Sequence, residues 1–250
     1  MKYKILYLVD KNYVKRKMSR TRFHSIESLS SMSDITISGN NWDNFDSHKT
    51  ISENFGEEIY KYNAVICYKP LEYKKFSEIP ITKILRYNEM YDIQNTIQEI
   101  NNSLPNIVIC HHYNDYIYYK KYYLEHYSNI QFFYIPHCCN KNIFKDYNLN
   151  KIYDITISGA FGKSILGNHY PIRQRISSLV FKYLKNKYNI YYHKHPGYTL
   201  EDAHTNKYCK QLAQIYNQSK ICITCSGKPK SRFGKYVEIP SCNSIICGDI

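Results

Sequence analysis

The chain has 250 residues, 43% apolar and 22% charged, which is enough for one large domain or two small ones with a substantial core. With 28 tyrosines it is too apolar to be disordered throughout, and it contains no run of about 18 apolar residues that would cross a membrane. The first residues, Met1–Asp10, form too short an apolar run for a secretion signal. The nine cysteines lie mostly in apolar runs, so we expect reduced core residues in a cytoplasmic protein.

The net charge of +13 is concentrated in the second half. Residues 1–150 carry 19 Lys and Arg against 16 Asp and Glu, whereas residues 151–250 carry 15 against 5. This asymmetry indicates an anionic partner such as nucleic acid, a membrane surface or a phosphorylated small molecule, with solvated lysines as the alternative. Codons of an AT-rich genome explain part of the tyrosine and lysine content.

Short β-branched runs alternate with longer amphipathic segments in the first half, which predicts alternating strands and helices. The predicted strands are Tyr3–Val9, Asp34–Ser38, Ala64–Tyr68, Ile107–Cys110 and Gln131–Ile135, and the predicted helices are Thr21–Met32, Asn95–Ser103 and Tyr116–Tyr127.

The same alternation restarts near Ile152. The predicted strands are Ile152–Ser158, Ile190–His193, Lys220–Thr224 and Ser244–Cys247, and the predicted helices are Arg173–Lys187, Tyr208–Gln218 and one that opens within Ser231–Glu238. In the first of these helices we expect Ile176, Leu179, Val180 and Leu184 to share the buried face.

This pattern predicts an α/β chain with two Rossmann-like parallel sheets covered by helices. The predicted domains are residues 1–136 and 152–250, joined by a hinge at 137–151. Because ligands of open parallel sheets bind beyond the carboxyl ends of the strands, functional residues are expected there.

Two segments at such strand ends suit a phosphate group. Gly159-Ala160-Phe161-Gly162-Lys163 follows a strand, so its backbone N–H groups and Lys163 would approach a phosphate, although a plain turn explains it equally simply. The segment Ser226–Pro240 contains Lys228, Lys230, Arg232 and Lys235 before a predicted helix, which is typical of a diphosphate site. An exposed basic loop is the alternative.

Three further side chains are candidates on the same argument. Glu238 is the only acid between Asp202 and Asp249, and its carboxylate would accept the hydroxyls of a ribose. His195, in a turn after a strand, would donate to a phosphate or a sugar. His111 and His112 follow a buried strand and are candidates for a general base.

Other site types have weaker support. His111 and His112 together with His137, Cys138 and Cys139 suggest zinc, but no paired C-x-x-C or H-x-x-x-H spacing accompanies them, so no metal is expected. Cys222-Ile223-Thr224-Cys225 falls in a predicted strand and fits the core better than a redox motif. A glycosidase would need two paired carboxylates, which the acid-poor second half does not favour. Nucleic-acid binding suits the basic, aromatic composition, but no recognised motif supports it.

Several of these segments resemble one family. Ile135–Phe144 (IPHCCNKNIF) resembles the interdomain hinge of GT-B glycosyltransferases, and Tyr236–Cys242 (YVEIPSC) resembles a segment of the group 1-type, CgeB-like members. The order of Asp154–Gly159, Tyr170–Arg175 (YPIRQR), His195–Tyr198 (HPGY) and Lys235–Pro240 is also similar, so the resemblance covers about residues 105–250.

The resemblance implies a metal-independent transfer of a sugar from a nucleotide-sugar donor, a UDP- or GDP-sugar, without a cofactor. The donor would bind the second domain, and a glycan, protein or small-molecule acceptor would bind the first. Glu238 matches the family's ribose-binding acid, and Arg232 and Lys235 match basic residues near the diphosphate. Asn243 replaces a family glycine, and the family continues past Ile250, so we expect an incomplete second domain and leave open a non-catalytic relative.

Overall fold

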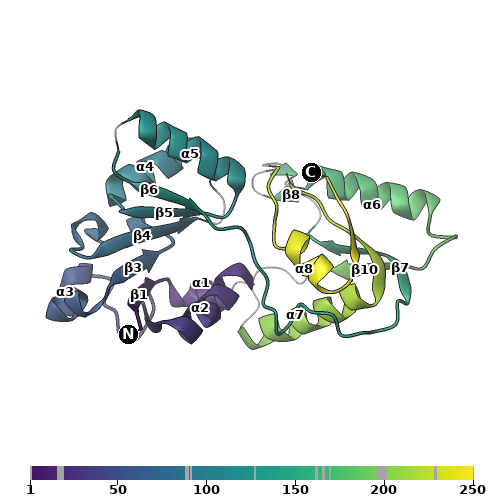
Figure 1. The fold of residues 1–250 in the computed structure, drawn as a ribbon, viewed down its shortest axis with the longest axis horizontal. Helices are drawn as coiled ribbons and strands as arrows, with labels where there is room; N and C mark the ends of the chain where they lie inside the picture. The colour runs from purple at the N-terminus through teal and green to yellow at the C-terminus, as the bar shows by residue number, and fades with distance from the viewer. Residues whose placement is uncertain are drawn as a thin grey trace. The chain divides into compact units, whose positions relative to one another are not determined.

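The computed structural model describes residues 2–15, 20–87, 90, 92–126, 128–160, 163–164, 167–168, 170–195, 202–227 and 230–249. The chain divides into two compact units, one formed by residues 1–17 and 25–136 and the other by residues 18–24 and 137–250. Each unit contains its own parallel sheet flanked by helices (Figure 1). The expectation of an α/β chain with two Rossmann-like parallel sheets is therefore confirmed.

The first sheet has six parallel strands in the order β2-β1-β3-β4-β5-β6. Their bounds are β1 Lys4–Leu8, β2 Asp34–Ser38, β3 Ala64–Cys67, β4 Thr82–Tyr87, β5 Ile107–Cys110 and β6 Gln131–Tyr134. Strand β4 is not predicted from the sequence, because Lys83 and Arg86 interrupt its apolar run. Both cations nevertheless lie within the sheet, and Arg86 is only 7% exposed.

Helices cover both faces of this sheet, as the alternation of side chains along β1 requires. Leu6 and Leu8 belong to a core that includes α4 and α5, whereas Tyr7 and Val9 belong to a core on the opposite face with Ile26 of α2. The helices are α1 Lys11–Lys15, α2 Arg20–Met32, α3 Ile51–Phe55, α4 Ile93–Ser103 and α5 Tyr113–Glu125, with 3-10 turns η1 Gly56–Lys61, η2 Pro70–Glu72 and η3 Phe76–Glu78.

The second sheet has four parallel strands in the order β10-β7-β11-β12. Their bounds are β7 Tyr153–Gly159, β10 Ile190–Lys194, β11 Ser219–Ile223 and β12 Ile245–Cys247, and a small antiparallel pair is formed by β8 Lys163–Ser164 and β9 Gly167–Asn168. The helices are α6 Pro171–Tyr183, α7 Asp202–Asn217 and α8 Lys235–Ser241.

The helices α6 and α7 lie on opposite sides of this sheet (Figure 1). Val180 of α6 packs with Ile157 and Ile223 on one face, while Leu212 of α7 packs with Ile239 of α8 on the other. The prediction that Leu179 would share the buried face of α6 is wrong, since this side chain is 46% exposed. Val180, one position further on, is the residue of this pair that faces the sheet.

Residues 137–151 contain no helix or strand, but they pack against the rest of the second unit. Ile143 and Phe144 are buried in the same core as α7 and α8. The Asn217 side chain accepts from the Tyr147 N–H at 2.6 Å and donates to the Lys145 carbonyl at 2.9 Å. This segment is thus anchored by core burial and by side chain–backbone hydrogen bonds.

Candidate functional site

The carboxyl edge of the second sheet brings several polar side chains together. Because the strands are parallel, β7 and β10 end side by side, with His193 opposite Ser158 and Lys194 opposite Gly159. On the other side of β7, Ile223 ends β11 opposite Ile157. The helices α6 and α8 follow β7 and β11 along the chain, so residues of both helices are available to this edge.

Lys235, the first residue of α8, places a buried ammonium group at the end of β7. Its side chain is 7% exposed and donates to the hydroxyls of Ser158 at 3.1 Å and Tyr216 at 2.8 Å. The ammonium nitrogen lies 5.5 Å from the centre of the Tyr216 ring, and the two hydroxyls are 2.9 Å apart. Two hydroxyl groups and a ring face thus contact this side chain.

Arg173, the third residue of α6, is the second buried cation. It is 3% exposed, its Nη1 donates to the Ala160 carbonyl at 3.2 Å, and its guanidinium stacks 4.1 Å from the centre of the Tyr170 ring. Its Nε is buried without a hydrogen-bond partner. Among the described residues no carboxylate pairs with it, so its charge and one donor are left for an anion.

Gly159 separates these two cations. Its φ is 111°, a backbone conformation that residues other than glycine rarely adopt. A Cβ at this position would lie 3.1 Å from Arg173 Cζ and 3.2 Å from Lys235 Cε. The glycine therefore permits both cations to pack against the end of the same strand.

Two more buried polar atoms at this edge lack a hydrogen-bond partner, His193 Nε2 and Thr224 Oγ1. His193 stacks on Tyr208, with ring centres 5.2 Å apart. Burial, and then the charge of Lys235, lower the pKa of His193, so the neutral ring is favoured. Together with Arg173 Nε, these atoms supply unsatisfied hydrogen-bonding groups around the ends of β10 and β11.

The loop after β11 is fastened to the residues that follow β12. The Asp249 carboxylate accepts from the Ser226 N–H at 2.8 Å and from the Ser226 hydroxyl at 2.7 Å. The Tyr236 hydroxyl donates to the Asp249 carbonyl at 2.8 Å. Burial alone would raise the pKa of Asp249, but the hydrogen bonds from Ser226 and Tyr236 together hold it below its usual value. These bonds fix the entry into the basic segment.

The residues predicted to bind a donor are only partly brought together. Gly159 and Lys235 meet at the end of β7, and Glu238 lies one turn further along α8, 3% exposed, with Oε1 close to Gly234. Arg232 is exposed and His195 half-buried. Of the remaining two residues, Lys163 has only its backbone described, in β8, and Lys228 lies outside the described residues.

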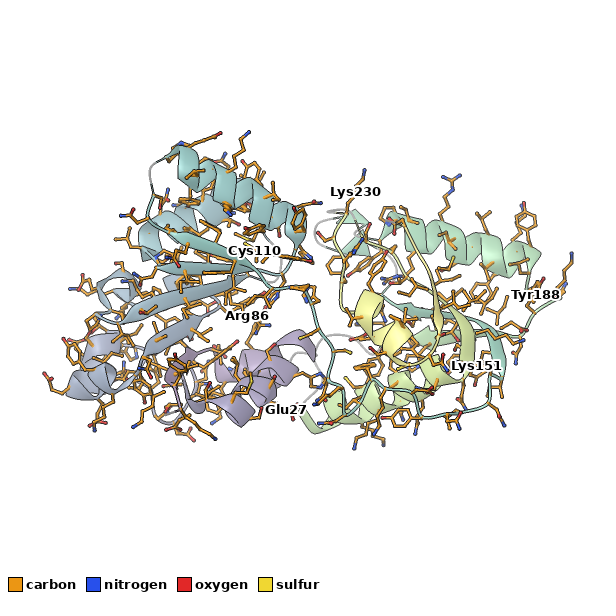
Figure 2. All side chains as sticks on the ribbon, viewed as in Figure 1. Glu27, Arg86, Cys110, Lys151, Tyr188 and Lys230 are labelled. Atoms are coloured by element: carbon orange, nitrogen blue, oxygen red, sulfur yellow. The ribbon has the colours of Figure 1, made fainter. Side chains whose placement is uncertain are left out.

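His111, one of the two predicted catalytic histidines, has both ring nitrogens engaged in the first unit. Arg86 Nε donates to its Nε2 at 2.7 Å, so its Nδ1 carries the proton and donates to the Ile135 carbonyl at 2.6 Å. Arg86 itself points toward α2, where it donates to Ser25 at 2.7 Å (Figure 2). This arrangement leaves neither nitrogen of His111 for a substrate proton.

His112, the other predicted catalytic histidine, is 3% exposed at the start of α5. Burial lowers its pKa to about 4, and burial followed by the charge of Arg86 lowers that of His111 to about 4. Both rings are therefore neutral at neutral pH. Asp115, on the same helix, has its pKa raised to about 6 by burial.

Within the described part of the chain, no group of three or more His, Cys, Asp or Glu side chains is placed to hold a metal ion. The cysteines there carry free thiols, and burial raises the pKa of Cys110 and Cys242 to about 12. Thiols with a pKa this high remain protonated at neutral pH, as is usual for cysteines buried in a core.

No family model matches the chain, and the search of curated proteins gives no match. No helix among the described residues is sufficiently long and apolar to span a membrane.

Arg173 and Thr224 were not expected at this edge from the sequence, and His193 was expected at a strand end but given no role. Arg173 lies in the first turn of α6, just after the proline that opens the helix. His193 and Thr224 are the last residues of two predicted strands. Such positions at helix starts and strand ends could have marked all three as candidate site residues. What the sequence lacks is the strand order, which places His193 beside Ser158 on one side of β7 and the end of β11 on the other side.

Proposed function

We propose that the protein is a glycosyltransferase whose second unit binds a nucleotide sugar, a UDP- or GDP-sugar. The observation that supports this proposal best is the pair of buried cations, Arg173 and Lys235, packed against Gly159 at the carboxyl edge of a parallel sheet. A diphosphate would supply the anion that the Arg173 guanidinium lacks among the described residues. The resemblance of residues 105–250 to GT-B glycosyltransferases selects a nucleotide sugar among diphosphates.

In the proposed reaction a hydroxyl oxygen of the acceptor bonds to the anomeric carbon of the donor sugar. The bond from that carbon to the diphosphate oxygen breaks, and the nucleoside diphosphate leaves with the electron pair. The hydroxyl proton passes to a general base. Arg173 and Lys235 would stabilise the charge that develops on the leaving diphosphate, the task that a metal ion performs in other transferases.

Glu238 is proposed to accept the hydroxyls of the donor ribose. Its carboxylate is buried on the same short helix as Lys235, three positions along, so one helix would present both a cation and an acid. The assignment to a ribose comes from the resemblance of Tyr236–Cys242 to the family's segment.

The test is binding of UDP and GDP to the full chain, measured by calorimetry and by the rise in melting temperature. Arg173→Gln should weaken binding at least about tenfold, since it removes a charged hydrogen-bond donor. Arg175→Gln is the matched control, because Arg175 is exposed two positions along the same helix and should bind like the native chain. Glu238→Gln should weaken the binding of UDP and GDP but leave the binding of inorganic diphosphate unchanged.

No binding of either nucleotide, or equal losses in Arg173→Gln and Arg175→Gln, would contradict the proposal. A non-catalytic relative is the second candidate, and the engagement of both nitrogens of His111 favours it. Release of the nucleoside diphosphate from a UDP- or GDP-sugar separates the two: a transferase releases it, whereas a binding protein retains the intact donor.

A further inference from the structure

Helix α6 carries an exposed apolar stripe in addition to the face that packs on the second sheet. Ile172, Leu179 and Tyr183 are between 38% and 59% exposed. They follow one another at intervals of seven and four residues, so a helix of about 3.6 residues per turn places all three on one side. Val180 occupies a different side, the one buried against the sheet. The three side chains, called here the α6 stripe, therefore form an apolar surface outside the core.

A row of cations borders the α6 stripe. Arg175 and Lys182 each come three residues after an apolar member of the stripe, a spacing that makes them neighbours on the helix surface. Both are exposed, as are Lys185 and Lys187 in the turn after the helix. The sequence contains no Asp or Glu between residues 155 and 200, and no described carboxylate pairs with any of these four cations. The row is therefore an uncompensated positive surface.

Exposed tyrosines continue this surface past the end of α6. Tyr188 lies in the turn after the helix and points outward (Figure 2). Tyr192 is exposed on β10, two positions after Ile190, which packs in the same core as Val180. Because side chains alternate along a strand, Tyr192 lies on the side of the sheet that α6 covers. Tyrosine rings with a free polar tip favour the interface between water and lipid.

Helix α5 of the first unit provides a contrast. It also exposes large apolar side chains, Ile117 and Leu124. It differs in charge, since it contains Asp115 and Glu125, and Glu125 pairs with Lys121 at 3.8 Å. Exposed apolar groups thus occur on both helices, whereas the combination with unpaired positive charge is a property of α6.

This combination favours an anionic lipid surface over other anionic partners. A second copy of the chain would present the same cations, so a symmetric contact through α6 would place like charges together. Nucleic acid would gain from the cations and the rings, but aliphatic groups such as Ile172 and Leu179 add little to stacking or phosphate contacts. A lipid interface rewards both, because apolar side chains enter the acyl boundary while Lys and Arg extend to the phosphates.

We propose that α6 binds the surface of an anionic membrane, with the α6 stripe in the boundary between headgroups and acyl chains. The cations of the bordering row would pair with lipid phosphates. With 13 residues the helix is too short to cross a bilayer, so it would lie in the plane of the interface. This partner goes beyond the proposed function and does not depend on it.

Sedimentation of the full chain with lipid vesicles tests the proposal. Vesicles of phosphatidylcholine mixed with phosphatidylglycerol should carry the chain down, vesicles of phosphatidylcholine alone should carry little of it, and added salt should release it. Leu179→Ser, and Lys182→Gln combined with Lys185→Gln, should each lower the partition coefficient about tenfold or more. The matched controls are exposed positions on α5: Leu124→Ser, and Lys120→Gln combined with Lys121→Gln, should partition like the native chain.

A fluorescent reporter locates the contact. Tyr183→Trp should show a blue shift of its emission when anionic vesicles are added, because the ring leaves water for the interface. Tyr60→Trp, at a similarly exposed tyrosine of the first unit, should show no shift. Trp42 gives the same background in both variants, since it is the single tryptophan of the native chain.

The proposal is overturned if anionic vesicles bind no better than neutral ones, or if Leu179→Ser, still folded by its melting curve, partitions like the native chain. A single-stranded RNA that binds more tightly than the anionic vesicles, and equally well to Leu179→Ser, would also overturn it, by assigning the row of cations to nucleic acid. Binding of UDP or GDP is a separate readout: its absence contradicts the proposed function and leaves the membrane surface standing.

Discussion

Two buried side chains of this protein, His111 and Arg173, differ in whether the chain itself satisfies their hydrogen-bonding groups. His111 bridges the Arg86 guanidinium and the Ile135 carbonyl, an arrangement that only the neutral ring satisfies, because a protonated Nε2 would face the Arg86 N–H. Arg173 shows the opposite case, since its guanidinium is buried and its Nε has no hydrogen-bond partner. The first arrangement is complete within the chain, whereas the second leaves a donor unsatisfied and so points to a ligand.

The neutral histidines predict a loss of stability in mild acid. The pKa values of His111 and His112 are about 4 in the folded chain, below the value near 6.5 of an unfolded histidine. Between these values the unfolded chain binds more protons, so the free energy of unfolding falls as the pH falls from about 6.5 toward 4. Asp115, with its pKa raised to about 6, opposes this trend because protonation of that carboxyl favours the folded chain.

Urea unfolding at pH 7 and pH 5 measures this effect. Each histidine should contribute a loss of roughly 1–2 kcal/mol over that interval. His112→Gln removes one titrating group and should show the smaller loss, while His48→Gln, at an exposed histidine, should behave like the native chain. An identical pH dependence in His112→Gln and the native chain would show that His112 titrates normally.

At the scale of helices and strands, apolar periodicity predicted most elements and failed where charge interrupts it. Ile107–Cys110 was recognisable as a buried parallel strand from its continuous apolar run. Strand β4 was not, because Lys83 and Arg86 occupy it. Lys83 donates to the carbonyl of Ser77 just before the strand, and the burial of Arg86 depends on His111, far along the chain. The candidate site was half predictable: Gly159 follows a predicted strand and Lys235 lies in the basic segment, but their meeting depends on β11 lying beside β7, which periodicity does not encode.

Helix α6 allows a direct test of which face it buries. Val180 is 7% exposed and packs with Ile157 and Ile223, whereas Leu179 beside it is 46% exposed. Val180→Ala should lower the free energy of unfolding by about 1–3 kcal/mol through lost packing, and Leu179→Ala should change it by no more than about 0.5 kcal/mol. Denaturant unfolding of both variants checks this, and a larger loss for Leu179→Ala would mean that the helix buries the other face.

At the scale of the whole molecule, the charge of +13 has two components with different physical consequences. Most lysines are solvated, and several make exposed pairs such as Lys61 with Glu58 and Lys75 with Glu78, whose contribution to stability is small. Arg173 and Lys235 are buried, so salt screens them much less. The magnitude of the net charge alone therefore does not identify the anionic partner.

Salt dependence distinguishes a small anion held by these two buried cations from nucleic acid held by the solvated lysines. Two cations on one diphosphate correspond to a loss of affinity of no more than about tenfold between roughly 50 and 200 mM salt. Contacts to six or more phosphates of a single-stranded nucleic acid would cost about 300-fold or more in affinity over the same range. Calorimetry with UDP or GDP, and electrophoretic shifts with a single-stranded RNA, should therefore give a shallow slope for the nucleotide and weak, steeply salt-dependent RNA binding. Tight RNA binding that Arg173→Gln leaves unchanged would instead assign the basic charge of the second unit to nucleic acid, because the buried pair would then have no part in it.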